Sequence, residues 1–227
     1  MNSPFSRLLP LFLRKKKDPR PRRHNIWKKG MHLKDPNTLV FLGINRTGSS
    51  SIFAWLNTHN IKYCMSRYQE DTERNYALIK EIESRDLRAF AVVRNPWDRA
   101  VSSWKHCMDK KQFPRCTFKE FIHAPLEQMT PQQRYHSSPQ WPHIVDCDGK
   151  IAHLNHVGRF ENLLGTCDWI ANALEFEPQE PIPHNNSSDR KQYASYYDEQ
   201  CIQKVAQVFR QDIEMFDYSF DESGATS

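Results

Sequence analysis

The stretch that decides the fold is residues 38–51, which read TLVFLGINRTGSSS. Its first part, Thr38 to Gly43, is a short apolar run that ends at glycine, as is typical of a strand buried on both faces of a sheet. Apolar residues at helical spacing follow between Ile52 and Leu56. The sequence therefore predicts a buried strand, a loop of small residues and a helix, in that order.

The same pattern occurs a second time further along the chain. A polar helix with apolar residues between Tyr76 and Ile82 precedes residues 89–93, another apolar run of strand length. Arg94 comes directly after that run, and Pro96 stands where proline suits the first turn of a new helix. Strands that alternate with helices indicate an α/β fold, so we expect a P-loop-like, doubly wound central parallel sheet flanked by helices.

The remainder of the chain gives weaker signals. Residues 117–120 have the form of a capping box that starts a short helix, and residues 125–142 read as an irregular loop rich in Gln, Pro and Ser. Residues 146–150 predict a turn between short strands. Residues 156–160 lead into a helix, and a last helix places apolar residues from 202 to 216 on one face. A single domain over residues 38–220 accounts for all these elements.

Residues 1–37 differ from the rest of the chain in charge. They hold 11 of the 32 Lys and Arg residues and only two acids, so this arm carries +9 and the remainder −4, within a total of +5. Such a basic, proline-broken segment predicts a disordered arm, and residues 221–227 predict a disordered tail. The alternative is that residues 1–30 tether the protein weakly to an anionic membrane surface, with apolar side chains entering beside the basic run.

Composition and hydropathy exclude several classes of protein. With 14 Pro and 7 Gly in 227 residues the chain is not collagen-like, and six dispersed Cys without a Cys-x-x-Cys pair do not form a disulfide scaffold. No apolar run approaches the roughly 20 residues that a membrane-spanning helix needs. The basic block follows the first apolar run instead of preceding it, which is the wrong order for a secretory signal. We therefore expect a cytoplasmic protein with reduced thiols, attached at most to the inner face of the membrane.

The loop between the first strand and the first helix has the spacing of a phosphate-binding P-loop, Gly43-x-x-x-x-Gly48-Ser49-Ser50. Ser49 stands where nucleotide-binding loops have lysine, and Arg46 lies inside the loop. Backbone N–H groups and the positive end of the helix dipole can still bind an oxyanion there. We therefore predict that the ligand of this loop is an activated anion other than a simple nucleoside triphosphate. The alternative is a tight strand-to-helix connection whose serines cap the helix.

A second basic group is predicted at the same edge of the sheet. Arg94 follows a buried strand and so lies at its carboxyl end, where ligands bind in open α/β folds. Ser102 lies two helical turns further on and can direct its hydroxyl to that edge. Anion contacts separate from the loop favour a nucleotide with a second phosphate. The alternative is that Arg94 only pairs with Asp98 on a helix surface.

These two motifs resemble those of the sulfotransferases that use 3′-phosphoadenosine 5′-phosphosulfate (PAPS). Residues 42–51 (LGINRTGSSS) resemble the family's 5′-phosphosulfate loop, and residues 90–102 (FAVVRNPWDRAVS) resemble its 3′-phosphate strand and helix. The resemblance is to the carbohydrate branch, which includes the chondroitin and heparan enzymes and small bacterial relatives. Further blocks similar to that branch are residues 157–163, 184–188, 196–198 and 212–220.

The resemblance implies a role for each matched position. The backbone of residues 46–51 and the serine hydroxyls would hold the 5′-phosphosulfate, while Arg94 and Ser102 would hold the 3′-phosphate. Arg46 stands where this branch has lysine, and it would support charge on the bridging oxygen as the bond to sulfur breaks. The implied donor-binding residues are Arg46, Thr47, Gly48, Ser49, Ser50, Ser51, Arg94 and Ser102.

Sulfuryl transfer also needs a base for the acceptor hydroxyl, but we expect no metal. By analogy with phosphoryl transfer, the reaction should be in line, with a loose transition state that positioning and positive charge stabilise. Histidine is the residue that most readily serves as the base near neutral pH. We predict His136, in the loop expected to face the acceptor; His59 and His143 are the other candidates.

The sequence therefore predicts a PAPS-dependent sulfotransferase that acts on a hydroxyl of a saccharide or glycoconjugate. Two other functions stay open. A P-loop kinase that acts on a small molecule is disfavoured by Ser49. A nucleic-acid-binding protein led by the basic arm would bind with a steep dependence on salt, conferred by residues 1–37. We expect no specific nucleic acid partner.

Overall fold

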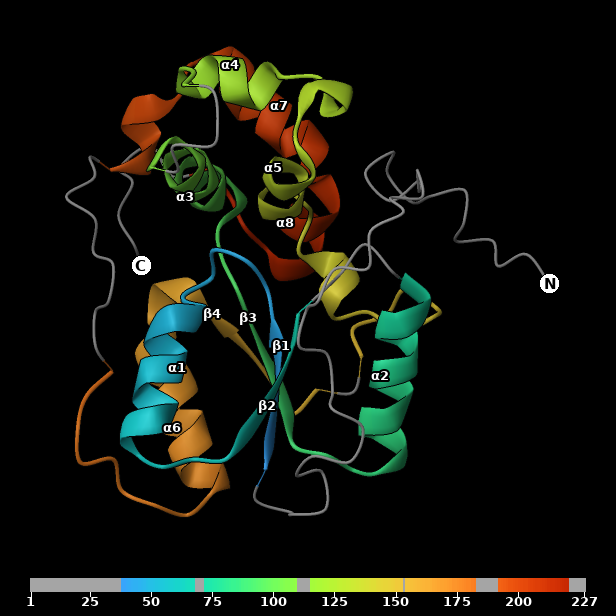
Figure 1. Cartoon of the computed structure of the whole chain (residues 1–227), viewed down its shortest axis with the longest axis vertical. Helices are drawn as coiled ribbons and strands as arrows, with labels where there is room; N and C mark the ends of the chain where they lie inside the picture. Colours follow the sequence, from blue (N-terminus) through green and yellow to red (C-terminus); the bar gives the residue numbers. More distant parts are fainter. Residues whose placement is uncertain (1–37, 68–71, 110–114, 153, 183–191, 221–227) are drawn as a thin grey trace.

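Parallel strands form the centre of the molecule (Figure 1). The computed structural model describes residues 38–67, 72–109, 115–152, 154–182 and 192–220, and within them one four-stranded sheet has the order β2-β1-β3-β4. The bounds are β1 Leu39–Gly43, β2 Tyr63–Arg67, β3 Ala89–Val93 and β4 His156–Arg159. Each neighbouring pair is parallel. The predicted α/β fold with a central parallel sheet is confirmed.

The two strands that the sequence predicts, β1 and β3, occupy the middle of the sheet. Every residue of both is buried, which agrees with their continuous apolar sequences. Phe41 of β1 lies opposite Phe90 of β3, and their rings stack with 4.7 Å between centroids. The edge strand β2 is not expected from the sequence, because YCMSR has no apolar run.

Helices cover both faces of the sheet, and alternate strand residues decide which helices each face meets (Figure 1). On one face, Phe41 packs in the same cluster as α1 (Ser49–Thr58) and α6 (Leu163–Ala173). On the opposite face, Val40 packs in a cluster with α2 (Thr72–Ser84). This alternation gives the doubly wound arrangement that the sequence predicts.

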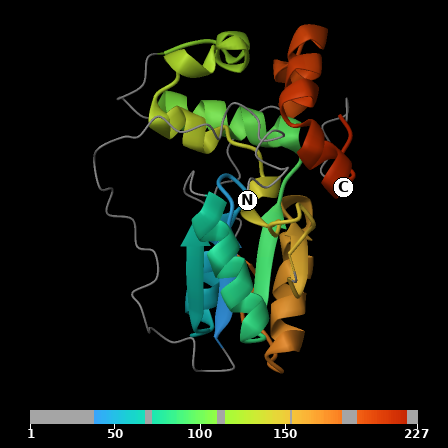
Figure 2. The same cartoon turned by 90° about the vertical axis from the view of Figure 1, so that its right-hand side faces the viewer.

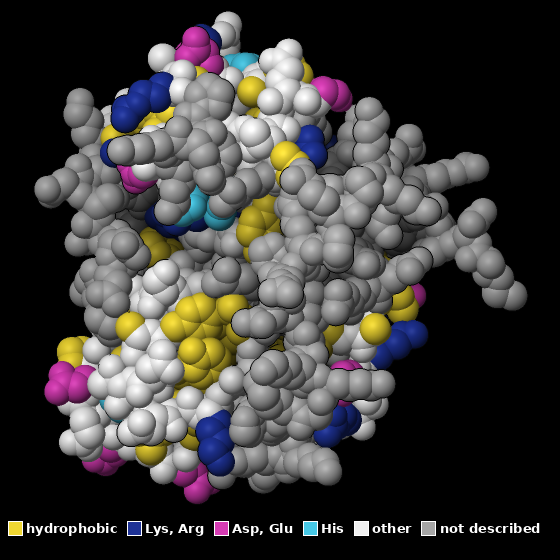
Figure 3. Space-filling model, in the orientation of Figure 1, with side chains coloured by type: hydrophobic (Ala, Val, Ile, Leu, Met, Phe, Trp, Pro, Cys, Tyr) yellow, Lys and Arg dark blue, Asp and Glu magenta, His cyan; other side chains and the backbone are white. Residues whose placement is uncertain are grey.

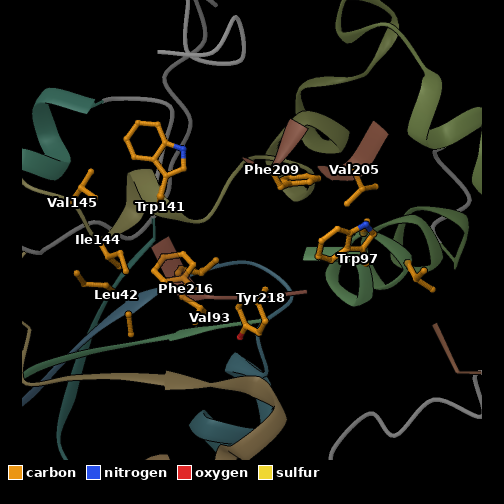
Figure 4. Close-up of a cluster of buried hydrophobic side chains, with 14 of the residues drawn as sticks. Leu42, Val93, Trp97, Trp141, Ile144, Val145, Val205, Phe209, Phe216 and Tyr218 are labelled. Atoms are coloured by element: carbon orange, nitrogen blue, oxygen red, sulfur yellow. The ribbon is translucent and has the colours of Figure 1, made fainter. Parts of the chain in front are cut away.

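A further layer of helices lies beyond the carboxyl ends of the strands (Figure 2). It contains α3 (Pro96–Asp109), α4 (Phe118–His123), α5 (Pro131–His136), α7 (Glu199–Val208) and α8 (Arg210–Phe216). This layer and the strand ends share one apolar cluster, part of which Figure 4 shows: Leu42, Val93, Trp97, Trp141, Ile144, Val205, Phe209, Phe216 and Tyr218. The layer therefore packs directly against the edge of the sheet at which the site is predicted.

Short 3₁₀ helices join these elements within the described residues. They are η3 (Leu126–Gln128), η4 (Trp141–His143), η5 (Phe160–Asn162) and η6 (Tyr193–Tyr196).

The expectation of an irregular loop over residues 125–142 is wrong. This stretch contains η3, α5 and η4, and α5 begins with a complete capping box. The Thr130 hydroxyl accepts the N–H of Gln133, while the Gln133 side chain accepts the N–H of Thr130. Pro131 occupies the first helical position. A Thr-Pro-x-Gln sequence is a helix-start signal, so α5 was readable from the sequence.

The expected last helix is two helices, α7 and α8, which break at Phe209. The Asp198 side chain caps α7 by accepting the N–H of Cys201 at 2.8 Å. Phe209 has non-helical dihedral angles (φ −108°, ψ 23°), and its ring stays buried in the same cluster as Val205 and Phe216. The amphipathic pattern is therefore right, and the single continuous helix is wrong.

Other local predictions are confirmed. Thr117 and Glu120 form the predicted capping box of α4, and α3 begins at Pro96. The turn at residues 146–150 is present, with the Asp146 carboxylate accepting the N–H groups of residues 148 and 150. The short strands expected beside this turn amount to one antiparallel bridge, between residues 145 and 151.

No helix in the described part of the chain combines the length and the apolar character needed to cross a membrane. The arm of residues 1–37 and the tail of residues 221–227 lie outside the described residues, as does the block at 184–188.

Gly158 of β4 faces α6 with no room for a side chain. A Cβ atom there would collide with Thr166 Oγ1 and lie 2.9 Å from His156 Nε2. We expect Gly158→Ala to lower the free energy of unfolding by about 1–3 kcal/mol, because β4 must move away from α6. Urea unfolding measures this change. Adding Thr166→Ala removes the colliding hydroxyl and should recover part of the loss; two strictly additive effects would contradict this explanation.

Candidate functional site

The loop after β1 turns through two residues with positive φ. Arg46 has φ 67° and Gly48 has φ 85°, and Thr47 lies between them. The hydroxyls of Thr47 and Ser49 both donate to the carbonyl of Ile44, at 3.0 and 3.3 Å. A backbone of this kind forms a concave row of N–H groups that suits an anion.

The helix that follows the loop is not capped by a serine. Gly48 is the N-cap of α1, and no side chain makes a capping hydrogen bond. The alternative in which serines cap this helix is therefore wrong. The first turn of α1 contains no acidic residue, so the positive end of its dipole faces the loop without an opposing carboxylate.

Gly48 is fixed by its surroundings as well as by its φ angle. A Cβ atom at this position would lie 2.9 Å from both Leu163 Cδ1 and Phe160 Cδ2. The loop therefore lies directly against the segment that joins β4 to α6.

The three predicted serines occupy different environments. Ser49 is partly buried and its hydroxyl bonds back to the loop, Ser50 is exposed, and Ser51 is buried. Of the three side chains, Ser50 is the one that solvent reaches most freely. The backbone, which all six loop positions share, is the better common anion-binding element.

Arg46 joins the loop to α3. Its guanidinium donates to the Ser102 hydroxyl through Nε at 3.1 Å and through Nη2 at 2.9 Å. The two motifs that the sequence places 56 residues apart therefore meet side chain to side chain.

Arg94 contacts the same loop from β3. Its Nη1 donates to the carbonyl of Arg46 at 2.8 Å, and its Cζ lies over the Phe160 ring, 3.8 Å from the centroid. It also pairs with Asp98, with 2.6 Å between Nη2 and Oδ2. The pairing of Arg94 with Asp98 is therefore present, but the two side chains are only 5% and 3% exposed. The alternative that they form a pair on a helix surface is wrong.

The backbone of Arg94 is held by a buried amide. Gln140 accepts the N–H of Arg94 at 2.9 Å and donates to its carbonyl at 2.8 Å. Gln140 is in turn fixed by Asp212 of α8, whose carboxylate accepts the N–H groups of Gln140 and Trp141. Residues from two distant parts of the chain thus set the position of one arginine.

A second buried arginine supports this arrangement. Arg99 of α3 donates to the carbonyls of Asn45, in the loop, and Ser138, just after α5. Burial lowers the pKa of Arg99 to about 10, which the charge of Asp212 opposes. Burial raises the pKa of Asp212 to about 6, against the effects of Arg99 and of the N–H groups it accepts. Near neutral pH both groups are therefore charged and compensate each other.

The histidine predicted as the base lies in a helix. His136 is the last residue of α5, and it is 9% exposed. Its carbonyl accepts the Ser103 hydroxyl at 2.7 Å, and its ring meets the ring of His106, with 4.6 Å between centroids. The expectation of a loop position is wrong. His106, on α3, is brought to the site by the fold and was not singled out from the sequence.

The other two candidates for the base are less suitable. His59 follows the far end of α1, where its ring contacts Trp55 and Phe176. His143 is buried, and burial together with the charge of Arg99 holds its pKa well below the usual value.

The described residues offer neither a metal site nor a disulfide. No group of three or more His, Cys, Asp or Glu side chains in this part of the chain could hold a metal ion. All six cysteines lie in it and are free thiols.

Comparison with known proteins agrees with this fold. The model of the sulfotransferase family matches residues 29–219, so the chain belongs to that family. It is thus a transferase of sulfuryl groups. The fold is similar to that of a sulfotransferase from Alicyclobacillus acidocaldarius, with a TM-score of 0.54 and 12% identity, over 80% of this chain and 94% of that one. A search of curated proteins gave no match.

The buried His143 leads to a prediction about pH. Its pKa is lowered in the folded protein, so below the ordinary value of 6.5 the unfolded chain binds a proton that the folded chain does not. Stability from this residue is therefore present at higher pH and is lost as the pH falls. When the pH is lowered from about 7.5 to 6, we expect the unfolding free energy of the wild type to fall by about 0.8 kcal/mol more than that of His143→Leu. Urea unfolding at both pH values measures this difference.

Asp212 is present both in the wild type and in His143→Leu. Its raised pKa acts in the opposite direction, and its contribution cancels when the two proteins are subtracted. The same pH dependence with and without His143 would show that the buried ring accepts a proton as readily as an exposed one.

Proposed function

We propose that this sulfotransferase takes its sulfuryl group from PAPS and transfers it to a hydroxyl of a saccharide or glycoconjugate. The observation that carries the proposal is the contact between Arg46 and Ser102. It brings the two motifs that resemble the 5′ and 3′ phosphate sites of PAPS enzymes within one hydrogen bond of each other. A nucleotide with phosphates at both positions fits such a pair of neighbouring sites.

The donor's 5′-phosphosulfate would lie on the loop. The backbone turns at Arg46 and Gly48, and the first turn of α1 has no acidic residue, so these groups suit an anion. The hydroxyls available there are those of Thr47 and Ser49–Ser51, of which Ser50 is the most exposed.

The donor's 3′-phosphate would be bound by Arg94 and Ser102. Arg94 is held in place through its backbone by Gln140 and through its guanidinium by Asp98. Such prior positioning reduces the entropy lost on binding. Ser102 gives its hydroxyl to Arg46 in the protein alone, and in the complex it would share that hydroxyl with the phosphate.

The transfer itself requires charge and alignment more than covalent chemistry. The acceptor oxygen attacks sulfur, the bond from sulfur to the bridging oxygen breaks, and the phosphate of the product takes the electron pair. Arg46 would stabilise that oxygen with its permanent positive charge. Donor and acceptor held in line provide the rest of the acceleration.

The acceptor is proposed from the resemblance to the carbohydrate branch. Labelled PAPS would be incubated with a panel of glycans and glycolipids, and mass spectrometry would detect the gain of one SO₃ group. Transfer to a saccharide hydroxyl supports the proposal. Transfer only to non-carbohydrate hydroxyls would contradict the proposed class of acceptor.

The donor proposal predicts how 3′-phosphoadenosine 5′-phosphate (PAP), the product of transfer, binds. We expect Arg94→Gln to weaken PAP binding about 100-fold and Ser102→Ala about 10-fold, because each removes a hydrogen bond to a charged phosphate. Isothermal calorimetry measures both. The matched control is Arg88→Gln, since Arg88 lies at the opposite end of β3 and donates to the carbonyl of Ala173.

The same preparation separates a nucleotide kinase from a sulfotransferase. In thermal-shift measurements PAP should stabilise the wild-type protein, and ATP with Mg²⁺ should not. A larger shift with ATP and Mg²⁺, or PAP affinity that Arg94→Gln leaves intact, would refute the assignment of the donor site.

A further inference from the structure

We infer that His106 takes the proton from the acceptor hydroxyl, and that His136 lies behind it as a positioning residue. This inference rests on the proposed function and gives to His106 the role of base that the sequence predicts for His136. It comes from how α3, α5 and the loop meet.

One side of α3 makes a series of contacts around the loop. Ser102 accepts the guanidinium of Arg46, Ser103 donates to the carbonyl of His136, and the His106 ring meets the His136 ring. Ser102 and His106 are four residues apart, so they are neighbours on one face of the helix. His106 therefore lies one turn from the residue that contacts Arg46.

Asn45 brings α5 to the same place. Its amide donates to the carbonyl of Tyr135, so the end of α5 is tied to the loop as well as to α3. The rings of Tyr135 and His136 also touch, with 5.4 Å between centroids. The position of His136 is thus fixed by its neighbours on both sides.

The two rings differ in their access to solvent. His136 falls in the buried class, while His106 is only partly buried. Figure 3 shows histidine side chains beside cationic side chains in a recess beneath the helical layer. Of the two rings, that of His106 is the one more open to an acceptor hydroxyl from solvent.

A base must be a neutral imidazole, and one described charge that reaches this turn of α3 is positive. Arg46 is close enough to the last turn of α3 for its charge to act on Cys107, the neighbour of His106. A positive charge beside an imidazole disfavours its protonated form. Besides these groups, Tyr135 faces the pair from α5. Burial raises the pKa of Cys107 to about 11, so that thiol adds no negative charge.

The proton balance of the step is complete. The acceptor O–H gives its proton to the neutral His106 as its oxygen bonds to sulfur, and the electron pair of the broken S–O bond goes to PAP. His106 then releases the proton to water. His136 keeps the ring of His106 in place, and a proton on either ring disfavours a proton on the other.

The test compares His106→Gln, His136→Gln and a matched control, His59→Gln, which alters a histidine beyond the other end of α1. The probe is labelled PAPS with unsulfated chondroitin as acceptor, with PAP binding measured separately by calorimetry. We expect His106→Gln to lower kcat about 100-fold and to abolish the acidic limb of the pH profile, with PAP affinity within twofold of wild type. His136→Gln should keep more activity and shift that limb.

Two results would overturn the inference: a kcat for His106→Gln within threefold of wild type, or a larger loss in His136→Gln than in His106→Gln. Failure of the proposed function has a different signature, because then wild type would not bind PAP.

A measurement independent of the acceptor keeps the inference testable if chondroitin is not a substrate. Proton NMR of the PAP complex follows the titration of the His106 ring. Its pKa should rise in His136→Gln, because a competing imidazole is removed. A titration of His106 that is unchanged by the loss of His136 would overturn the coupling between the rings.

Discussion

The site depends on one buried amide. The Gln140 side chain hydrogen-bonds both the N–H and the carbonyl of Arg94 at the end of β3, and the backbone N–H of Gln140 donates to the carboxylate of Asp212. Without a partner, each of these buried polar groups would cost about 1–3 kcal/mol. Satisfied together, they join the sheet, the segment after α5 and the last helix. Asp98 holds the guanidinium of the same arginine, so Arg94 has little freedom left to lose when it binds an anion.

The sheet supplies the frame for this arrangement. β1 and β3 are adjacent, parallel and buried, so the loop after one and the arginine after the other must emerge at the same edge. The helices α1 and α3 then start there, and α3 carries Ser102 and His106 over that edge. Parallel strands followed by helices are a general means of collecting ligands at one end of a sheet.

Sequence patterns predict the parts of this structure that are local. The apolar runs of β1 and β3, the first residue of α3 and the P-loop-like spacing each depend on neighbouring residues. β2 was not expected because its residues are mixed in polarity, and its place is set by pairing with β1. The helix α5 also has a local start signal, the capping box of Thr130 and Gln133, so it belongs to the predictable parts.

The candidate site divides in the same way. Arg46, Arg94 and Ser102 follow from motifs, and the structure brings all three together. The supporting residues do not belong to any local motif. Gln140 acts on a residue 46 positions earlier and Asp212 on one 72 positions earlier, and His106 meets His136 only because α3 and α5 pack together. Such contacts depend on the tertiary fold, which a single sequence does not display.

The left-handed backbone at Arg46 has a consequence for how position 46 can vary. A residue with a Cβ atom in this conformation costs about 1–2 kcal/mol, and that cost is the same for arginine and for lysine. Exchange between them therefore leaves the turn untouched and changes only the cationic group, from a planar fork with several donors to a compact ammonium. Position 46 thus isolates head-group chemistry from main-chain conformation, which makes it a clean place to measure what a delocalised charge does that a point charge does not.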